Sequence, residues 1–219
     1  LIRIITTITR ADSGSVILDG EKLSSRHPSQ IGYMPEERGL YKKMKVGEHL
    51  MYLAQLKDLS RKDAKREINY WFDRLQITDW WDKKIEELSK GMQQKIQFIA
   101  TVVHQPKLLI LDEPFSGLDP INTNLIKDEI AELNRQGTSI IFSTHRMEQV
   151  EQICEKIVLI NQGQNVLEGD VHAIKQQFKE HLFQIDYNGE LPKSLTVEDE
   201  TNDSYQILER KDNQLIIKV

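Results

Sequence analysis

The sequence predicts an α/β fold built around a buried parallel sheet. Residues 108–111 form an uninterrupted apolar run bounded by turn residues, which is typical of a strand buried on both faces. Further strand-like runs at 31–34 and 138–143 alternate with segments of helical periodicity. Asp112 and Glu113 follow the central run directly. Because ligands of such folds bind at the carboxyl ends of the strands, we expect a polar site there.

The composition indicates a globular protein with a single cysteine. The chain has 219 residues, of which 39% are hydrophobic and 29% are charged. A formal net charge of -5 with scattered Lys and Arg argues against non-specific nucleic-acid binding. Cys154 cannot form an internal disulfide, which suits a reducing compartment. No apolar run approaches the ~18 residues of a membrane span, and the first residues do not resemble a signal peptide. Any work at a membrane would therefore be that of a peripheral subunit.

The first part of the chain combines a helix with short strands. Residues 1–8 have a helix-compatible pattern without a preceding cap, so we expect the helix to be truncated at its start. Residues 15–18 read as a strand, and Asp19-Gly20 is a hairpin signal. The strand at 31–34 leads into a polar loop that contains Glu36.

The middle of the chain predicts an all-helical insert. Its helical periodicity runs from Val46 to about Lys84, and Ser60 with Asp63 resembles a capping signal. We expect the aromatic residues of the insert to pack in a core or between helices rather than to stack on a ligand. These aromatics are Trp71, Trp80 and Trp81.

Capping residues also place the helices on either side of the central strand. We expect Ser89 to be the N-cap of the helix that precedes the central strand. Asp119-Pro120 opens the next helix, with a cap followed by proline, and this helix runs to about Arg135. Residues 138–143 are rich in β-branched side chains and predict a buried strand, with His145 at its carboxyl end.

The last part of the chain differs from the rest in its pattern of apolar residues, which favours short strands. A short helix through Ile153 precedes strands at 156–160 and 165–167. Beyond about residue 180, apolar residues alternate at 183, 185 and 187 and again at 215, 217 and 219, with an acidic loop at 198–200. The pattern predicts a small β or α+β appendage over 179–219 that ends inside a strand, so we expect both termini to be truncated.

Five stretches resemble, in order and spacing, the motifs of ATP-binding cassette (ABC) ATPases. Residues 88–92 (LSKGM) resemble the signature motif, Asp112-Glu113 the Walker B motif, residues 116–119 the D-loop and His145 the switch histidine, while residues 35–37 fall where the family has its Q-loop. The resemblance covers about residues 1–178. The stretch at 36–41 and the appendage look most like ATP-binding subunits of ABC-2-type exporters, including sodium-export-type members.

This resemblance implies a P-loop-type parallel-sheet ATPase core over residues 1–178, with the helical insert at about 46–90 and an accessory domain at 179–219. It implies ATP and Mg²⁺ as cofactors. Glu113 would orient or deprotonate the attacking water, and His145 would contact the γ-phosphate. Asp112, with Glu36, would hold Mg²⁺.

The remaining motif residues would act between subunits. Ser89 and Gly91 would complete the nucleotide pocket of a partner subunit in trans, since a helix N-terminus is an anion site. Asp119 would cap its own helix and also communicate across the dimer.

Three departures from the family pattern stand out. Lys90 and Met92 replace a Gly and the Gln of the usual LSGGQ, and Glu36 stands where Gln is usual. The chain also contains no GxxxxGK[ST] loop, which supplies the phosphate-binding backbone N–H groups and lysine. We expect the sequence to begin just after that loop and expect this chain alone to be inactive.

The resemblance favours the ATP-hydrolysing subunit of an ABC exporter. Such a subunit would work at the cytoplasmic face of the membrane with an integral membrane permease and a second ATP-binding subunit, without nucleic acid. One alternative is a soluble ABC-type ATPase of translation or DNA maintenance, which tandem cassettes with a basic linker or a long coiled-coil insert would favour. The other is a non-catalytic regulatory cassette, which an upstream region without the loop lysine would favour.

Overall fold

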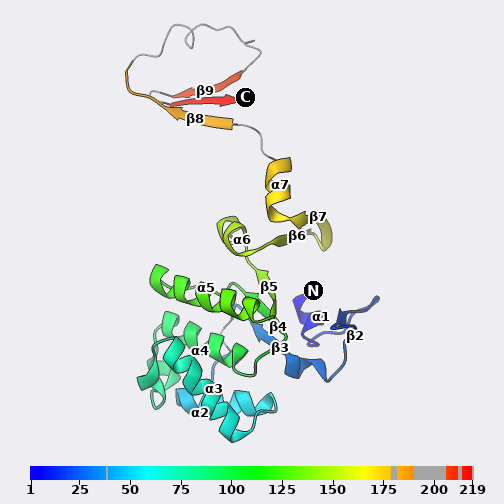
Figure 1. Cartoon of the computed structure of the whole chain (residues 1–219), viewed down its shortest axis with the longest axis vertical. Coiled ribbons are helices and arrows are strands. Elements are labelled where there is room, and N and C mark those ends of the chain that lie inside the picture. The colour runs from blue at the N-terminus through cyan, green and yellow to red at the C-terminus, as the bar shows by residue number, and fades with distance from the viewer. Residues whose placement is uncertain (38, 179–181, 190–205, 212–213, 219) are drawn as a thin grey trace. The chain divides into compact units, whose positions relative to one another are not determined.

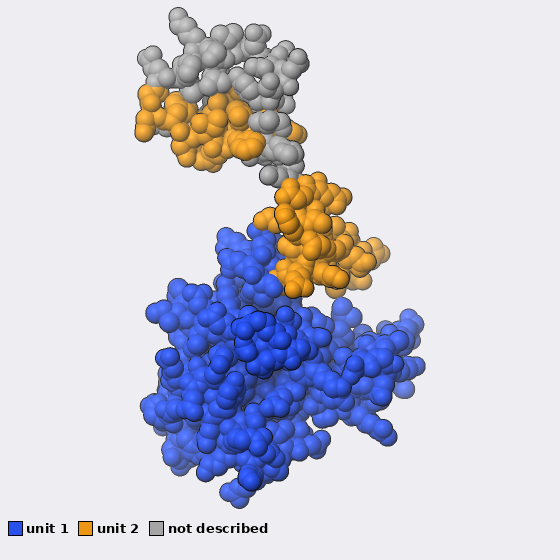
Figure 2. All heavy atoms as spheres, in the orientation of Figure 1, with its two compact units in different colours: residues 1–153 blue, residues 154–219 orange. Residues whose placement is uncertain are grey.

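The computed structural model describes residues 1–37, 39–178, 182–189, 206–211 and 214–218. These residues belong to two compact units, 1–153 and 154–219 (Figure 2). The sequence predicts a domain boundary near residue 178, and that boundary remains a prediction.

The first unit is built on a three-stranded parallel sheet in the order β3-β4-β5 (Figure 1). The strands are β3 (Ile31–Met34), β4 (Leu108–Asp112) and β5 (Ser139–Ser143). The first four residues of β4 are buried, which confirms the predicted central strand. The prediction that β5 is a buried strand was wrong: Ile141 is 37% exposed. Among the described strands β5 pairs only with β4, so it lies at an edge, and β-branched composition does not reveal how many neighbours a strand has.

Side chains alternate between the two faces of this sheet. One face carries Ile31, Leu108 and Ile110, which pack with apolar residues of the first part of the chain. That part contains α1 (Ile2–Ile5), β1 (Ile17–Leu18), β2 (Glu21–Lys22) and the 3-10 turn η1 (His27–Gln30). Helix α1 is shorter than the predicted 1–8. The predicted hairpin is confirmed: Leu18 pairs with Glu21 across Asp19-Gly20, whose φ values are +55° and +80°.

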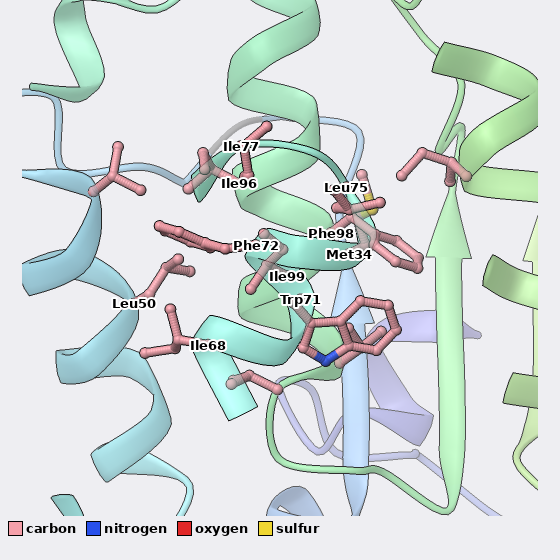
Figure 3. Packing of buried hydrophobic residues seen from close by; sticks show 14 of the residues in the cluster. Met34, Leu50, Ile68, Trp71, Phe72, Leu75, Ile77, Ile96, Phe98 and Ile99 are labelled. Atoms are coloured by element: carbon pink, nitrogen blue, oxygen red, sulfur yellow. The ribbon is translucent and has the colours of Figure 1, made fainter. Parts of the chain in front are cut away.

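The other face of the sheet carries the main core and the helical insert. The insert contains α2 (Val46–Leu56), α3 (Arg61–Arg74), η2 (Thr78–Trp80), η3 (Ile85–Glu87) and the start of α4 (Lys90–Val102). Trp71 is 4% exposed, and Trp80 and Trp81 pack against the same cluster, which confirms their packing role. Figure 3 shows Met34 of β3 among the side chains that the insert contributes.

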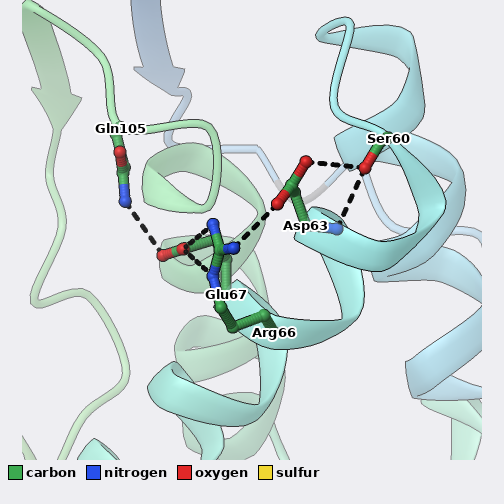
Figure 4. A network of polar contacts seen from close by, with 5 residues as sticks. All are labelled: Ser60, Asp63, Arg66, Glu67 and Gln105. Atoms are coloured by element: carbon green, nitrogen blue, oxygen red, sulfur yellow. Dashed lines mark hydrogen bonds and ion pairs between the residues drawn. The ribbon is translucent and has the colours of Figure 1, made fainter.

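A polar network fixes the start of α3 (Figure 4). Ser60 caps the helix by accepting from the Asp63 N–H at 3.1 Å, as the sequence predicts. Arg66 pairs with Asp63 at 2.8 Å and with Glu67 at 3.0 Å. Gln105 donates to Glu67 at 3.0 Å. The network therefore joins α3 to the turn that follows α4.

An ion pair joins the insert to α5 (Pro120–Arg135). The Arg74 guanidinium donates to both carboxylate oxygens of Glu129, the shortest contact being 2.8 Å, and Glu129 is 4% exposed. A paired geometry of this kind compensates much of the cost of burying the carboxylate. Helix α6 (Met147–Ile153) ends the first unit.

The second unit contains two small antiparallel sheets. Strands β6 (Lys156–Asn161) and β7 (Gln164–Asp170) form a ribbon followed by α7 (Val171–Gln177). Strands β8 (Leu182–Asp186), β9 (Gln206–Lys211) and β10 (Gln214–Lys218) form a sheet in the order β8-β10-β9. The predicted alternating segments thus form β8 and β10, whereas the acidic loop at 198–200 and Val219 lie outside the described residues. In the described part of the chain, no helix has the length and apolarity to cross a membrane.

Candidate functional site

The carboxyl ends of the three parallel strands meet at one edge of the sheet. Met34 pairs with Leu111, and Asp112 pairs with Ser143. The residues at the ends of these strands and just beyond them therefore lie next to one another along that edge. They are Pro35 and Glu36 after β3, Asp112 and Glu113 at the end of β4, and Thr144 and His145 after β5.

Glu113 and His145 are in direct contact at this edge. One carboxylate oxygen, Oε1, accepts from the backbone N–H of His145 at 2.8 Å and lies 2.7 Å from its ring Nδ1. The Glu113 side chain is only 12% exposed, whereas that of His145 is 78% exposed. The contact therefore joins a largely covered carboxylate to an imidazole that is open to solvent.

The backbone of Glu113 is held in an unusual conformation. Its φ is +48°, which a side chain larger than glycine rarely adopts. The backbone N–H of Glu113 donates to the Ser143 carbonyl at 2.9 Å, which continues the pairing of β4 with β5 beyond Asp112. Backbone strain of this kind is typical of functional sites, where the surrounding structure compensates for it.

Hydrogen bonds keep the Glu113 carboxyl ionised. Burial raises its pKa, but hydrogen bonds from the His145 backbone, the Thr144 side chain and the His145 ring outweigh burial, so the pKa of Glu113 lies below its ordinary value. At neutral pH the group is a carboxylate, and a weak base. It is suited to accepting a hydrogen bond from a water molecule and less suited to removing a proton in full.

Asp112 and Glu36 offer oxygen ligands at the same edge. Burial, and next the negative charge of Asp112, raise the pKa of Tyr33 in the neighbouring strand. Glu36 is exposed in the loop after β3, and no hydrogen bond or ion pair joins it to the other predicted site residues in the described part of the chain. Although no cluster of three or more potential metal ligands occurs there, Mg²⁺ commonly takes only one or two carboxylates, with water and phosphate completing its shell. The residues present fit such an ion.

The helix caps predicted at Ser89 and Asp119 are confirmed. The Ser89 Oγ accepts from the Met92 N–H at 3.2 Å, and Asp119 accepts from the Asn122 N–H at 2.9 Å. The pKa of Asp119 is lowered, first by that backbone N–H and next by the Asn122 side chain. The caps fix the orientation of the first turn of α4 and of α5.

The predicted signature and D-loop segments lie against each other within the chain. A Cβ atom added at Gly91 would lie 3.3 Å from the Gly117 carbonyl oxygen and 3.7 Å from Leu118 Cδ2. Gly91 therefore leaves room for the turn that leads to Asp119, whereas a larger residue would press against it.

Sequence reasoning missed three side chains around this edge. Gln94 donates to the Pro114 carbonyl at 2.8 Å, Gln97 donates to the Pro35 carbonyl at 2.6 Å, and the Thr144 side chain helps to lower the pKa of Glu113. The two glutamines, spaced three apart, are polar residues on the face of α4 that also carries the buried Thr101. A polar side chain at a core position of an amphipathic helix is the signal that would have found them.

The profile of the family described as ABC transporter matches residues 1–116. The chain belongs to the ABC transporter family of ATP-binding proteins. It is 49% identical over 176 residues to an uncharacterized ABC transporter ATP-binding protein, YhaQ of Bacillus subtilis, with 80% of this chain and 59% of that protein covered. It is 29% identical over 178 residues to the ABC transporter ATP-binding protein NatA of the same organism, with 80% of this chain and 72% of NatA covered.

A solved structure of similar fold is described as the structure of an ATP binding subunit of an ABC transporter. Its TM-score is 0.74 at 27% sequence identity, and the match covers 81% of this chain and 75% of that one. The likeness confirms the P-loop-type ATPase core. This ABC protein chain spans about three fifths of the length of YhaQ.

Proposed function

We propose that this chain is the main part of an ATP-hydrolysing subunit of an ABC exporter. In this proposal two such subunits form a dimer at the cytoplasmic face of the membrane and drive a separate integral membrane permease. Family membership supports ATP binding, and the contact between Glu113 and His145 at the carboxyl edge of the sheet is the observation that carries hydrolysis.

Each side chain at the edge would have a distinct role. Glu113, held ionised, accepts a hydrogen bond from the attacking water and so orients it. Asp112 and Glu36 would hold Mg²⁺, which supplies charge neutralisation for the phosphates when bound. Catalysis of phosphoryl transfer depends mainly on such positioning and on electrostatic stabilisation.

The ring of His145 would link Glu113 to the terminal phosphate. A carboxylate can only accept a hydrogen bond, so Nδ1 carries the proton in the 2.7 Å contact. Nε2 lies at the other side of the exposed ring. It can donate to a phosphate oxygen only when it also carries a proton, so the doubly protonated ring is the form that binds both partners.

Ser89 and Gly91 would act on the nucleotide of the partner subunit. Ser89 is exposed and caps α4, whose first turn carries backbone N–H groups and the positive end of the helix dipole. Lys90, which replaces a Gly of the usual signature, adds a positive charge at the same place.

The test uses the full-length protein, extended upstream to include a phosphate-binding loop, and its membrane subunits. We expect the two to purify together and to hydrolyse ATP in a Mg²⁺-dependent manner in liposomes. ATP hydrolysis without any associated membrane protein would favour the soluble alternative, and ATP binding without hydrolysis would favour the regulatory one.

A further inference from the structure

Helix α4 and the turn after it run beside the whole of β3, and the contacts between them involve backbone carbonyl groups. At the start of the strand, the His104 ring Nε2 lies 3.2 Å from the Ile31 carbonyl oxygen. In the middle, a Cβ atom added at Gly32 would lie only 2.5 Å from the Thr101 carbonyl oxygen. The helix and the strand are therefore closely packed, and their contacts follow one another in order along β3.

At the end of β3 this series of contacts reaches the candidate site. The Gln97 side-chain amide donates to the Pro35 carbonyl at 2.6 Å, across 62 residues of sequence. The carbonyl of Pro35 and the N–H of Glu36 belong to one planar peptide unit. A donor that fixes the carbonyl therefore also fixes the direction in which the backbone enters Glu36.

The other end of the Gln97 amide is unusual. Gln97 is 5% exposed, and its Oε1 has no hydrogen-bond partner among the described residues. Leaving a buried acceptor unpaired destabilises the fold, because the group has lost its hydrogen bonds to water and gained none in the protein. A side chain kept for stability alone would avoid that cost, so its one strong bond, to the Pro35 carbonyl, is the feature that explains a glutamine here.

We propose that Gln97 is a positioning residue for Glu36, holding the Pro35–Glu36 peptide so that the Glu36 carboxylate faces the Mg²⁺ of the site. This inference rests on the proposed function. It assigns no direct contact with substrate to Gln97, which acts only through Glu36. Gln94, on the same helix, donates to the Pro114 carbonyl in the turn that follows Glu113, and this bond holds that turn rather than the peptide of Glu113 itself.

The first test measures the order of the Glu36 amide by ¹⁵N relaxation in the 219-residue chain. Gln97→Met keeps the shape of the side chain and removes the donor. We expect the Glu36 order parameter to fall from about 0.85 to below about 0.6. The control is Gln93→Met on the same helix, where Gln93 donates to the Leu88 carbonyl at 2.9 Å, and it should leave Glu36 rigid. An unchanged order parameter in Gln97→Met would overturn the proposal.

A second variant covers the possibility that Gln97→Met does not fold. In Gln97→Glu a buried carboxyl is held neutral and can donate its proton to the Pro35 carbonyl. Glu36 should then be rigid at low pH and lose order as the introduced carboxyl ionises. Order that does not depend on pH, in a folded Gln97→Glu protein, would contradict the proposal.

A third measurement separates positioning from stability. In the full-length protein, Gln97→Met should raise the Mg²⁺ concentration for half-maximal hydrolysis roughly 10–100-fold, as expected when a metal ligand loses its supporting residue. In a Glu36→Ala background the same change should have no further effect, whereas a merely structural role would give additive effects. If wild type shows no Mg²⁺-dependent hydrolysis, the proposed function fails, and the relaxation data still decide whether Gln97 holds Glu36.

Discussion

Oε1 of Glu113 accepts a hydrogen bond from the backbone N–H of His145 at 2.8 Å and lies 2.7 Å from the Nδ1 of the same residue. One oxygen of the carboxylate is thereby fixed, and the end of β4 is tied to the loop after β5. Glu113 therefore has a structural role, which is to accept these hydrogen bonds, and a chemical role, which depends on its charge. A substitution can remove the second role and keep the first.

Replacing Glu113 by Gln should nearly abolish turnover in the full-length protein, and it should leave ATP binding and a nucleotide-trapped dimer intact. The amide oxygen of Gln still accepts from the His145 N–H, but the side chain loses the charge that orients water. Loss of such a group typically costs 10²–10⁴-fold in rate. Steady-state ATP hydrolysis measures turnover, and gel filtration with ATP detects the nucleotide-trapped dimer. The control is Glu148→Gln, which changes an exposed carboxylate on α6. Turnover within a few-fold of wild type would remove Glu113 from this role.

The surface around Tyr41 and the start of α2 should contact the membrane subunit. Tyr41 is 52% exposed and packs edge-on against His49 and Tyr52, which leaves an aromatic surface close in sequence to Glu36. Met44 and Met51 are only partly exposed, and Met51 packs against the core, so Tyr41 is the better anchor. Cysteine at position 41 should cross-link to the permease, and cysteine in place of Tyr70, which is 44% exposed on α3, should not. Cross-links from other surfaces and none from positions 38–51 would refute this placement.

Gly32→Ala should destabilise the first unit. The added methyl group would lie 2.5 Å from the Thr101 carbonyl oxygen, and a helix backbone cannot move aside as a side chain can. Overpacking of this kind costs about 1–3 kcal/mol. Urea unfolding measures the loss, and Gly39→Ala is the matched control because nothing lies within 4 Å of its added methyl. Equal stability of the two variants would show that α4 and β3 are not packed as described.

The buried histidine of α2 should make the protein sensitive to acid. His49 is fully buried with both ring nitrogens unpaired, and burial lowers its pKa to about 4, whereas the unfolded value is about 6.5. Below pH 6.5 the unfolded chain binds the proton and the folded chain does not, so stability falls as the pH drops from 6.5 towards 4. Between pH 7.5 and pH 5, His49 should lower the free energy of unfolding by about 2 kcal/mol.

Replacing His49 by Leu should remove this share of the pH dependence. At pH 7.5 the variant should be at least as stable as wild type, because no buried ring nitrogen is left unpaired. Urea unfolding at pH 7.5 and 5 measures both values, with exposed His172→Leu as control. His104, whose pKa is also lowered to about 4, mainly by burial, leaves a similar pH dependence in place. A variant as acid-sensitive as wild type would show that His49 is not buried in its neutral form.

Local signals predicted the elements of the site better than its contacts. The Ser89 and Asp119 caps and the apolar run of β4 depend on residues within one turn or one strand, so the sequence alone predicts them. The bond from Gln97 to Pro35 and the pairing of Glu113 with His145 join residues 62 and 32 positions apart. No periodicity reports such contacts, because they depend on how α4 and β5 pack. The exposure of β5 was missed for the same reason.

The 219-residue chain should bind MgATP very weakly. The phosphate-binding loop of the family supplies several backbone N–H donors and a lysine, and the chain contains no such sequence. Hydrogen bonds to charged groups are worth roughly 1.5–3 kcal/mol each. The loss of three would remove about 5–9 kcal/mol, which is more than a thousandfold in affinity.

The groups that remain cannot make up this loss. Asp112, Glu113 and Glu36 are acidic and repel a triphosphate unless Mg²⁺ bridges them, and the lowered pKa of Glu113 keeps its charge in place at neutral pH. Ser89 and Gly91 would act on the nucleotide of a partner, and a partner of the same sequence lacks the same loop. Calorimetric titration with MgATP, beside a version extended upstream through the loop, measures the difference. Micromolar binding by the 219-residue chain would mean that the nucleotide binds through groups other than the carboxyl edge of the sheet described above.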